Sequence, residues 1–247
     1  MDDAVFHSIT HLTNFARISV FSSFENSDIA HEKFLHQIHL PDRVTIPTYH
    51  EVTRRVLMPV KNNTTMDFLL TRRSRPAKTL TLPIPTHSEV MQILTAGART
   101  PDHGKLEPWR FIVLSKSALS KLADLAENCA RDHELDEDSV AKARKQFDQG
   151  HLAIAVVEVQ KASEKIPPIE QTYSAGAVCL ALLNASLASG WGANWLSGWP
   201  SHDRSFVENG LDLEANERIA GLIYLGTETA TPPERPRPNL ETIVKWL

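Results

Sequence analysis

The sequence predicts a mixed α and β fold, in which helices pack on a layered sheet. Three observations support this prediction. Segments with helical and with strand periodicity alternate along the chain. The β-branched run at 151–159, HLAIAVVEV, is typical of a buried strand. The stretch at 174–189 carries no charge and no proline, so it predicts a helix that is apolar on nearly every face.

This central helix must be buried on every face, in a core, an interface or a membrane. A membrane span needs roughly 20 apolar residues, and Asn184, Ser186 and Ser189 interrupt the stretch too early. Small residues such as Gly176 would let other backbones approach closely. We therefore expect a helix buried in a core or an interface, followed at Gly190 by a sharp turn into a strand.

Length and composition limit the class of protein. The 247 residues are enough for one large domain or a domain with an appendage. The net charge of −4 provides no global field that would recruit nucleic acid. The two cysteines form no metal-ligand spacing and no disulfide framework, which suits a reducing cytoplasm. The N-terminus lacks a signal-peptide pattern. We expect a cytoplasmic protein without a metal and without a nucleic-acid or membrane partner.

Residues 1–65 differ from the rest of the chain. They hold six of the eleven histidines and no sustained strand pattern. The segment at 32–40, EKFLHQIHL, predicts a short amphipathic helix. The histidine spacings match no metal-site template, so we interpret them as scattered solvated side chains. The polar, turn-like segment at 59–65 marks a boundary between an N-terminal extension at 1–65 and a folded domain at 66–247.

The folded domain opens with two helices. The segment at 66–74, MDFLLTRRS, has an apolar side and predicts a short helix. The prolines at 79–85 favour an extended linker. Thr86, with Glu89 three residues later, forms a capping box that begins the next helix. The turn at 100–104 ends that helix.

Strands and helices alternate in the middle of the domain. The segment at 109–114, WRFIVL, predicts a strand. An amphipathic pattern predicts a helix at 117–132, and a charged pattern predicts an exposed helix at 138–149. The buried strand at 151–159 follows and leads to the central helix.

The last part of the domain combines strands with a stiff tail. We expect a strand at 193–197, a short helix at 201–209 and a last buried strand at 219–226. The four prolines at 231–238 exclude a helix or a central strand there. The apolar residues at 243–247 suggest that this arm docks on something, such as another subunit.

Three stretches are candidates for chemistry. The basic run at 72–75, RRSR, offers guanidinium forks that match phosphate oxygens, although a solvated basic turn at a helix end also explains it. Arg99 and His103 either reach one ligand or cap the last helical carbonyls. The stretch at 195–198, WLSG, is either a strand edge open to a planar ligand or ordinary sheet.

The sequence offers no side chain that would carry difficult chemistry alone. It contains no G-x-S-x-G nucleophile motif, no reactive cysteine and no paired-carboxylate signature. It also lacks the glycine-rich phosphate loops of Rossmann and Walker sites. This combination of phosphate clamps and aromatic surfaces points to a bound cofactor that supplies the reactive group.

Four blocks in order resemble the nitroreductase family of FMN-dependent oxidoreductases, most of all its small bacterial NAD(P)H nitroreductase branch. The blocks are LLTRRSRP, ILTAGARTPDHGKLEPWRFIVL, EQTYSAGAVCLALLNASLASGWGANWLSGW and IAGLIYLGT, and the resemblance covers residues 66–247. It implies an α+β fold with a central, mainly antiparallel sheet flanked by helices. It also implies a homodimer with two FMN sites at the interface and exchanged C-terminal arms.

The resemblance also implies roles for individual positions. The positions matched to FMN contacts are Arg72, Arg73, Ser74, Arg99, His103, Trp195, Leu196 and Ser197. The positions matched, more loosely, to the NAD(P)H donor are Ala185, Ser186, Leu187, Ala188, Ser189 and Gly190. Arg99 and His103 would reach FMN across the dimer interface. Leu196 departs from the pattern, because relatives carry an arginine there.

The activity implied by the resemblance is a two-step electron transfer. NADH or NADPH would pass hydride to flavin N5, leave, and be replaced in the same slot by a nitroaromatic, a quinone or another conjugated acceptor. No catalytic side chain is expected, because FMN carries the chemistry. Two alternatives stay open: a dehalogenase or flavin-consuming enzyme on the same scaffold, and a non-catalytic or regulatory flavin-binding module.

The N-terminal extension provides a first testable prediction. A protein that begins at Met66 should fold, dimerise and bind FMN like the full chain, because the family resemblance ends there. Flavin absorbance and light scattering of both proteins check this expectation. An insoluble or flavin-free truncated protein would show that the domain boundary lies elsewhere.

Overall fold

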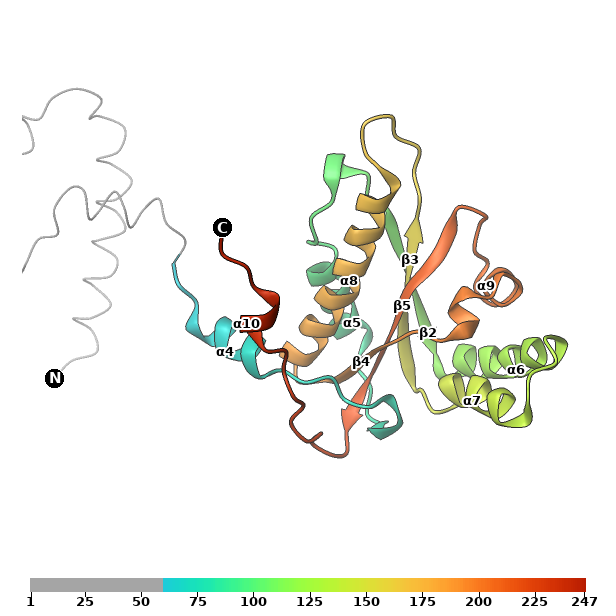
Figure 1. Ribbon diagram of the computed structural model, residues 1–247. Coiled ribbons are helices and arrows are strands. Elements are labelled where there is room, and N and C mark those ends of the chain that lie inside the picture. The colour runs from blue at the N-terminus through green and yellow to red at the C-terminus, as the bar shows by residue number, and fades with distance from the viewer. Residues whose placement is uncertain (1–59) are drawn as a thin grey trace, which may run out of the picture. The chain divides into compact units, whose positions relative to one another are not determined.

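The computed structural model describes residues 60–247, and the segment from Asn62 to Leu247 forms one compact unit (Figure 1). The helix expected at 32–40 lies outside the described residues. The elements, in chain order, are α4 (Asn63–Thr71), η1 (Ala77–Thr79), β1 (Leu80–Thr81), α5 (His87–Gly97), η2 (His103–Lys105), β2 (Trp109–Ser115), α6 (Lys116–Asp132), α7 (Glu137–Asp148), β3 (Leu152–Val159), α8 (Pro168–Ala188), β4 (Gly192–Leu196), η3 (Trp199–His202), α9 (Arg204–Leu211), β5 (Glu217–Glu228) and α10 (Leu240–Ile243).

Side-chain caps begin several helices, and that of α5 was expected from the sequence. The capping box of α5 is present: Thr86 Oγ1 accepts a hydrogen bond from the Glu89 amide, and the Glu89 carboxylate accepts one from the Thr86 amide. Asn62 caps α4, so this helix begins slightly before Met66. The side chain of Asp136 caps α7 in the same way.

Several local expectations differ from the structure. The helix expected at 66–74 ends at Thr71, and the exposed helix expected at 138–149 buries Val140, Ala143 and Phe147.

The linker expected at 79–85 contains the two-residue strand β1, which exists because Leu80 and Thr81 pair with the end of β5. The single helix expected at 201–209 is divided into η3 and α9. The division falls at Asp203, whose side chain accepts the Phe206 amide and starts a new helix.

The sheet is built around β5. This strand pairs with β3 on one edge and with β4 and then β1 on the other, and β2 pairs with β3. Every pairing is antiparallel, which confirms the mainly antiparallel sheet flanked by helices. The five-stranded sheet has the order β1-β5-β3-β2, with β4 off this path.

Helices cover both faces of the sheet (Figure 1). On one face, α6, α7 and α9 pack on a cluster that includes Ala153 and Ala155 of β3. On the other face, α5 and α8 pack on a cluster that includes Ile154 and Val156. Because successive strand residues point to opposite faces, β3 is buried on both sides, which explains its continuous β-branched sequence.

The central helix α8 is buried on one side only. Val178, Cys179 and Leu182 face the sheet and are fully buried. By contrast, Ile169 and Tyr173 expose 51% and 68% of their surface. The expectation that this helix is covered on every face is therefore not met within a single chain. No helix in residues 60–247 is long and apolar enough to cross a membrane.

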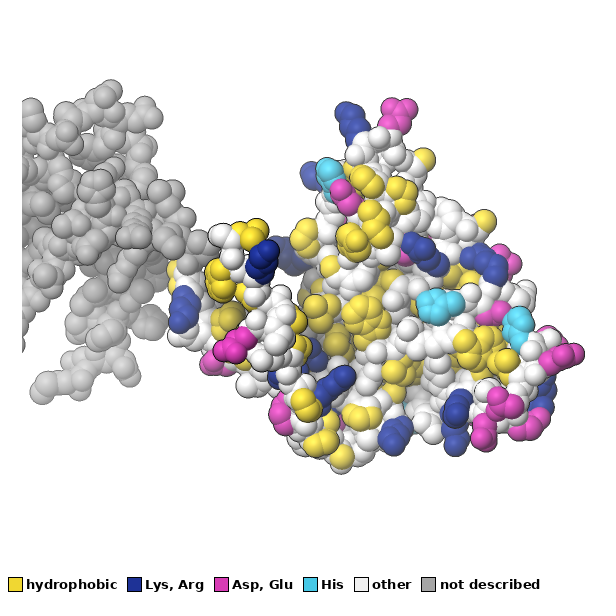
Figure 2. Space-filling view, in the orientation of Figure 1, with side chains coloured by type: hydrophobic (Ala, Val, Ile, Leu, Met, Phe, Trp, Pro, Cys, Tyr) yellow, Lys and Arg dark blue, Asp and Glu magenta, His cyan; other side chains and the backbone are white. Residues whose placement is uncertain are grey.

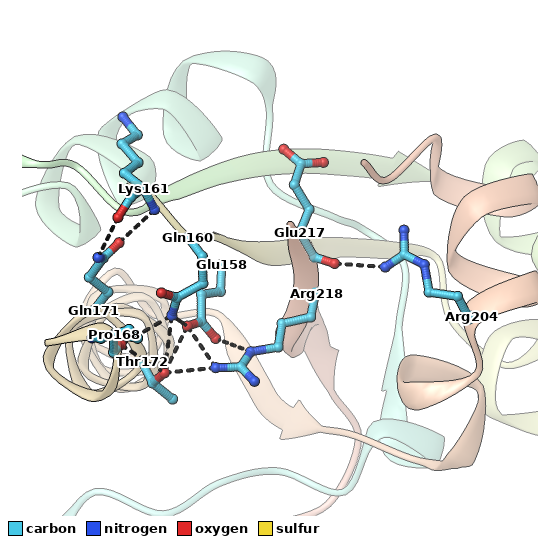
Figure 3. A network of polar contacts seen from close by, with 9 residues as sticks. All are labelled: Glu158, Gln160, Lys161, Pro168, Gln171, Thr172, Arg204, Glu217 and Arg218. Carbon is cyan, nitrogen blue, oxygen red and sulfur yellow. Dashed lines mark hydrogen bonds and ion pairs between the residues drawn. The ribbon is translucent and has the colours of Figure 1, made fainter. Parts of the chain in front are cut away.

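A polar network joins the first turns of α8 to the sheet (Figure 3). The carboxylate of Glu158, only 2% exposed, accepts hydrogen bonds from Arg218 Nε at 2.6 Å and from Thr172 Oγ1 at 2.8 Å. Gln160 Nε2 also donates to it. Burial opposes ionisation of Glu158, but the hydrogen bonds from Arg218, Thr172 and Gln160 outweigh it and lower the pKa.

Replacing Glu158 by Gln should destabilise the protein by about 2–3 kcal/mol, because a buried partner of Arg218 is lost while Arg218 stays half exposed. The lowered pKa of Glu158 contributes stability that is present above about pH 4.3, the ordinary value for glutamate, and is lost as the pH falls below it. The variant should therefore lose less stability on acidification.

Urea unfolding between pH 3 and pH 7 measures both effects. Glu164→Gln is the matched control, because Glu164 is exposed in the loop that follows β3. Equal acid sensitivity of Glu158→Gln and the wild type would contradict the prediction.

Candidate functional site

The basic run at 72–75 forms an extended loop directly after α4. Arg72, the C-cap residue of α4, has an extended backbone with φ −58° and ψ 141°. The Arg75 amide donates to the Ala193 carbonyl at 2.8 Å, and Asn194 Nδ2 donates to the Arg75 carbonyl at 2.7 Å. The loop is therefore fixed to the start of β4.

A pocket of about 320 Å³ lies beside this loop. The ends of α4, α8 and β5 meet there. The residues that line it are Phe68, Thr71, Arg72, Arg73, Arg75, Leu187, Gly190, Trp191 and Glu228. We call it the arginine pocket.

Arg72 is the guanidinium in this pocket with the fewest partners. Its Nη2 donates to Ser74 Oγ at 3.2 Å, whereas its Nε is buried without a hydrogen-bond partner among the described residues. Burial lowers the pKa of Arg72, and the nearby positive charges of Arg237, Arg73 and Arg75 lower it further. A buried donor without an acceptor is costly, so this position favours an anionic ligand.

The other arginines around the pocket have carboxylate partners. Arg75 pairs with Glu228, and Arg73 Nη1 lies 3.2 Å from Glu234 Oε1. Arg237 Nη2 lies 2.9 Å from the same Glu234 oxygen. Four guanidinium groups and two carboxylates leave a formal charge of +2. That charge matches a phosphate monoester, which carries up to two negative charges near neutral pH.

The expected donor segment at 185–190 forms the end of α8 and the turn after it. Leu187 and Gly190 line the arginine pocket. Ser186 and Ser189 instead bond back to their own helix, donating to the carbonyls of Leu182 and Ala185 at 2.8 Å. Ala185 packs against the core beneath α8, and Ala188 is exposed.

Gly190 has a positive φ of 84°, the left-handed conformation that ends many helices. This geometry produces the sharp turn from α8 into β4 that was expected at this residue.

Of the pair Arg99 and His103, His103 lies at the opposite end of α8. Both residues follow α5, and His103 Nδ1 is 2.6 Å from Glu170 Oε2 in the first turn of α8. Ser174 of α8 holds the same turn, since its hydroxyl donates to the Pro101 carbonyl at 2.9 Å. At a rise of 1.5 Å per residue, Leu187 lies roughly 26 Å along the helix from Glu170. In one chain, His103 is therefore far from the arginine pocket, and Arg99 does not line that pocket.

The third expected group lies on β4. Trp195 is 38% exposed, and its indole covers Gly221 of β5, where a Cβ atom would lie 2.1 Å from the indole nitrogen. The side chain of Leu196 packs against the cluster beneath α6, α7 and α9. Ser197 is exposed just after the strand. None of these three side chains lines the arginine pocket.

One acidic residue that lines the pocket, Glu228, and two charged C-terminal residues beside it were not predicted from the sequence. Glu228 ends β5, and Glu234 and Arg237 belong to the proline-rich tail. The charged residues in the stretch ERPRP could have suggested a further ionic site. Nothing local in the sequence indicates that this stretch meets Arg73, about 160 residues earlier in the chain.

The described residues contain no cluster of His, Cys, Asp and Glu side chains that would hold a metal ion. Both cysteines are buried, and burial raises the pKa of Cys179 to about 12. A buried thiol with a raised pKa is a poor nucleophile.

Comparisons with known proteins agree with the fold and identify the family. The model of the Nitroreductase family matches residues 69–227. The chain is 33% identical to the Putative NAD(P)H nitroreductase YdjA of Escherichia coli (strain K12), over 66% of this chain and 87% of that protein. The chain belongs to the nitroreductase family. A Putative NAD(P)H nitroreductase of Haemophilus influenzae (strain ATCC 51907 / DSM 11121 / KW20 / Rd) is 32% identical, with the same coverage.

Solved structures of the family share this fold. A nitroreductase-like family protein from Bacillus cereus superposes with a TM-score of 0.63 at 19% identity, over 77% of this chain and 99% of the other. A nitroreductase from Desulfovibrio desulfuricans, solved in complex with FMN, superposes with a TM-score of 0.60 at 20% identity, over 76% and 99%. The family resemblance of the four sequence blocks is thus confirmed.

Proposed function

We propose that this protein is an FMN-dependent oxidoreductase that takes electrons from NADH or NADPH and passes them to a small conjugated acceptor, such as a nitroaromatic or a quinone. One observation carries the proposal. The arginine pocket combines a formal charge of +2 with a buried, unpartnered Arg72 Nε. FMN ends in a phosphate monoester, whereas riboflavin has no phosphate.

The pocket residues fit the phosphate end of such a cofactor. Arg72 and Arg73 would hold the phosphate by paired charge-assisted hydrogen bonds. Ser74 would add a hydroxyl beside Arg72, to which it is already bonded. When bound, FMN would supply the hydride and electron chemistry that no described side chain offers.

The end of α8 and strand β4 would orient the remaining parts. Leu187 and Gly190 present an apolar and a backbone surface to the pocket, consistent with the donor segment at 185–190. Among the described strands, β4 pairs only with β5. The Arg75 amide takes the Ala193 carbonyl on the other edge, so only the later part of β4, near Trp195 and Leu196, would offer backbone groups to a planar ring. Trp195 and Ser197 would frame that ring. Because Leu196 points into the core, its contribution would be its backbone.

A complete site on this scheme needs two copies of the chain. His103 contacts Glu170, which lies roughly 26 Å along α8 from Leu187 of the arginine pocket, and Arg99 does not line that pocket. Two chains related by a two-fold axis, with their α8 helices crossing, would place this pair of one copy near the pocket of the other. We therefore propose a homodimer with cofactor sites between subunits and a single slot for donor and acceptor.

The exposed side of α8 is suited to that contact. Ile169, Tyr173 and Leu180 are 45–68% exposed and lie on one uncharged side with Gly176; we call this side the α8 stripe. A Cβ atom at Gly176 would meet nothing within 4 Å, so another helix has room to approach. Figure 2 shows exposed hydrophobic side chains over α8 and also over α4 and α10. The C-terminal residues Trp246 and Leu247 are almost fully exposed and would form the exchanged arm.

Purified protein should be yellow and carry FMN without a covalent bond. Replacing Arg72 and Arg73 together by Ala should weaken FMN binding by at least about 100-fold, because each charge-assisted bond contributes about 1.5–3 kcal/mol. Fluorescence titration of flavin-free protein measures the dissociation constant. The control is Arg131→Ala with Lys142→Ala, which removes two cations from α6 and α7 across the sheet. Unchanged FMN retention would place the clamp elsewhere.

Leu180→Asp should convert the dimer to a monomer, because it places a charge in the α8 stripe. The variant should also bind FMN more weakly, since Arg99 and His103 of the second copy are lost. Light scattering at low concentration measures the mass. Leu135→Asp, at an exposed leucine after α6, is the matched control. A wild-type monomer that holds FMN would refute the shared site, and removal of residues 241–247 tests the arm separately.

A further inference from the structure

Within residues 60–247, the polar contacts between the C-terminal tail and the rest of the chain come from one side chain. Residues 230–247 follow β5, and nearly all of them are exposed. Within residues 60–247, the hydrogen bonds and ion pairs that join this tail to the rest of the chain all come from Arg73. Its Nη1 donates to the Pro233 carbonyl at 2.6 Å and lies 3.2 Å from Glu234 Oε1. Arg73 thus belongs both to the arginine pocket and to the tail attachment.

Glu234 stabilises an arrangement that positive charge alone would disfavour. One of its oxygens lies between Arg73 and Arg237, at 3.2 Å and 2.9 Å. Arg237 is close enough to Arg72 for its charge to be felt there, although both are cations. Without the carboxylate, Arg237 would be repelled from Arg72 and Arg73. Glu234 itself accepts a hydrogen bond from the Arg235 amide, which fixes its orientation.

The prolines allow this one polar attachment to orient the whole tail. Pro232, Pro233, Pro236 and Pro238 surround Glu234 and restrict the backbone on both sides. A stiff segment transmits the position of one fixed residue to its neighbours, whereas a flexible one would not. Fixing Glu234 therefore also fixes the direction in which α10 and the apolar C-terminus leave the domain.

We propose that Glu234 is a positioning residue that locks the proline-rich tail to Arg73, holds Arg237 beside Arg72, and thereby couples phosphate binding in the arginine pocket to docking of the C-terminal arm. This inference rests on the proposed FMN function for the identity of the phosphate. Coupling of this kind is reciprocal: a bound phosphate steadies the tail, and a docked tail tightens phosphate binding.

The carboxylate in the pocket, Glu228, and the one beside it, Glu234, make the proposal testable, because charge and position predict opposite results for Glu234. Glu234→Gln raises the formal charge of the pocket from +2 to +3, so simple electrostatics predicts tighter FMN binding. Loss of the tail attachment predicts weaker binding. Glu228→Gln makes the same charge change at the partner of Arg75 and leaves the tail attachment in place.

The experiment titrates flavin-free full-length protein with FMN and, separately, with riboflavin, which lacks the phosphate. Glu234→Gln should raise the FMN dissociation constant about tenfold and leave the riboflavin constant unchanged. Glu228→Gln should bind FMN more tightly than the wild type, because it removes a negative charge from the lining of the pocket. Glu234→Asp should recover part of the loss. FMN binding by Glu234→Gln that equals or exceeds that of Glu228→Gln would overturn the proposal.

Hydrogen exchange at residues 239–247 provides a second measurement. FMN should slow exchange there in the wild type and in Glu228→Gln, but not in Glu234→Gln. Protection by FMN that is equal in all three proteins would overturn the coupling. If the wild type binds no FMN, the proposed function fails first. The tail attachment is then tested without ligand. Residues 239–247 should exchange faster in Glu234→Gln than in the wild type or in Glu228→Gln.

Discussion

The antiparallel pairing of β5 is the constraint on which the rest of the structure depends. This strand holds β3 on one edge and β4 and β1 on the other, so most of the sheet would come apart without it. Its 12 residues are long enough to serve three neighbours. The close contacts require glycine, because a Cβ atom at Gly221 would collide with Trp195 and one at Gly226 with the β1 backbone.

The same strand also positions charged residues of the arginine pocket. Glu228, its last residue, reaches Arg75, while β4 beside it holds the Arg75 backbone through Ala193 and Asn194. The arginine pocket therefore forms where the end of the sheet meets the ends of two helices. Its cations are spaced by carboxylates, which reduces their mutual repulsion without neutralising the site. In the proposed function, a phosphate would bind this pocket because Arg72 keeps a buried donor without a partner among the described residues.

The sequence was informative wherever structure follows from local pattern. The strand at β3, the helices α6 and α7 and the capping box of α5 all depend on periodicity or on residues three apart. The strand β1 was missed because its two residues acquire a strand geometry only by pairing with β5, about 147 residues later along the chain. The basic loop at 72–75 was found from its composition, and the family resemblance gave it a role. Glu234 and Arg237 were missed because a proline-rich tail carries no periodicity that indicates where it folds back.

The length of α8 also determines where this protein tolerates insertions and deletions. One extra residue inside this helix would advance everything after it by 1.5 Å and rotate it by about 100°. That change would rotate the later residues of the α8 stripe away from the side of the helix on which the earlier ones lie. It would also move the arginine pocket relative to His103. The exposed connection between α6 and α7 has no comparable role, since residues 133–136 position nothing at either end of α8. Natural length variation should therefore accumulate between α6 and α7, while α8 keeps a constant number of residues.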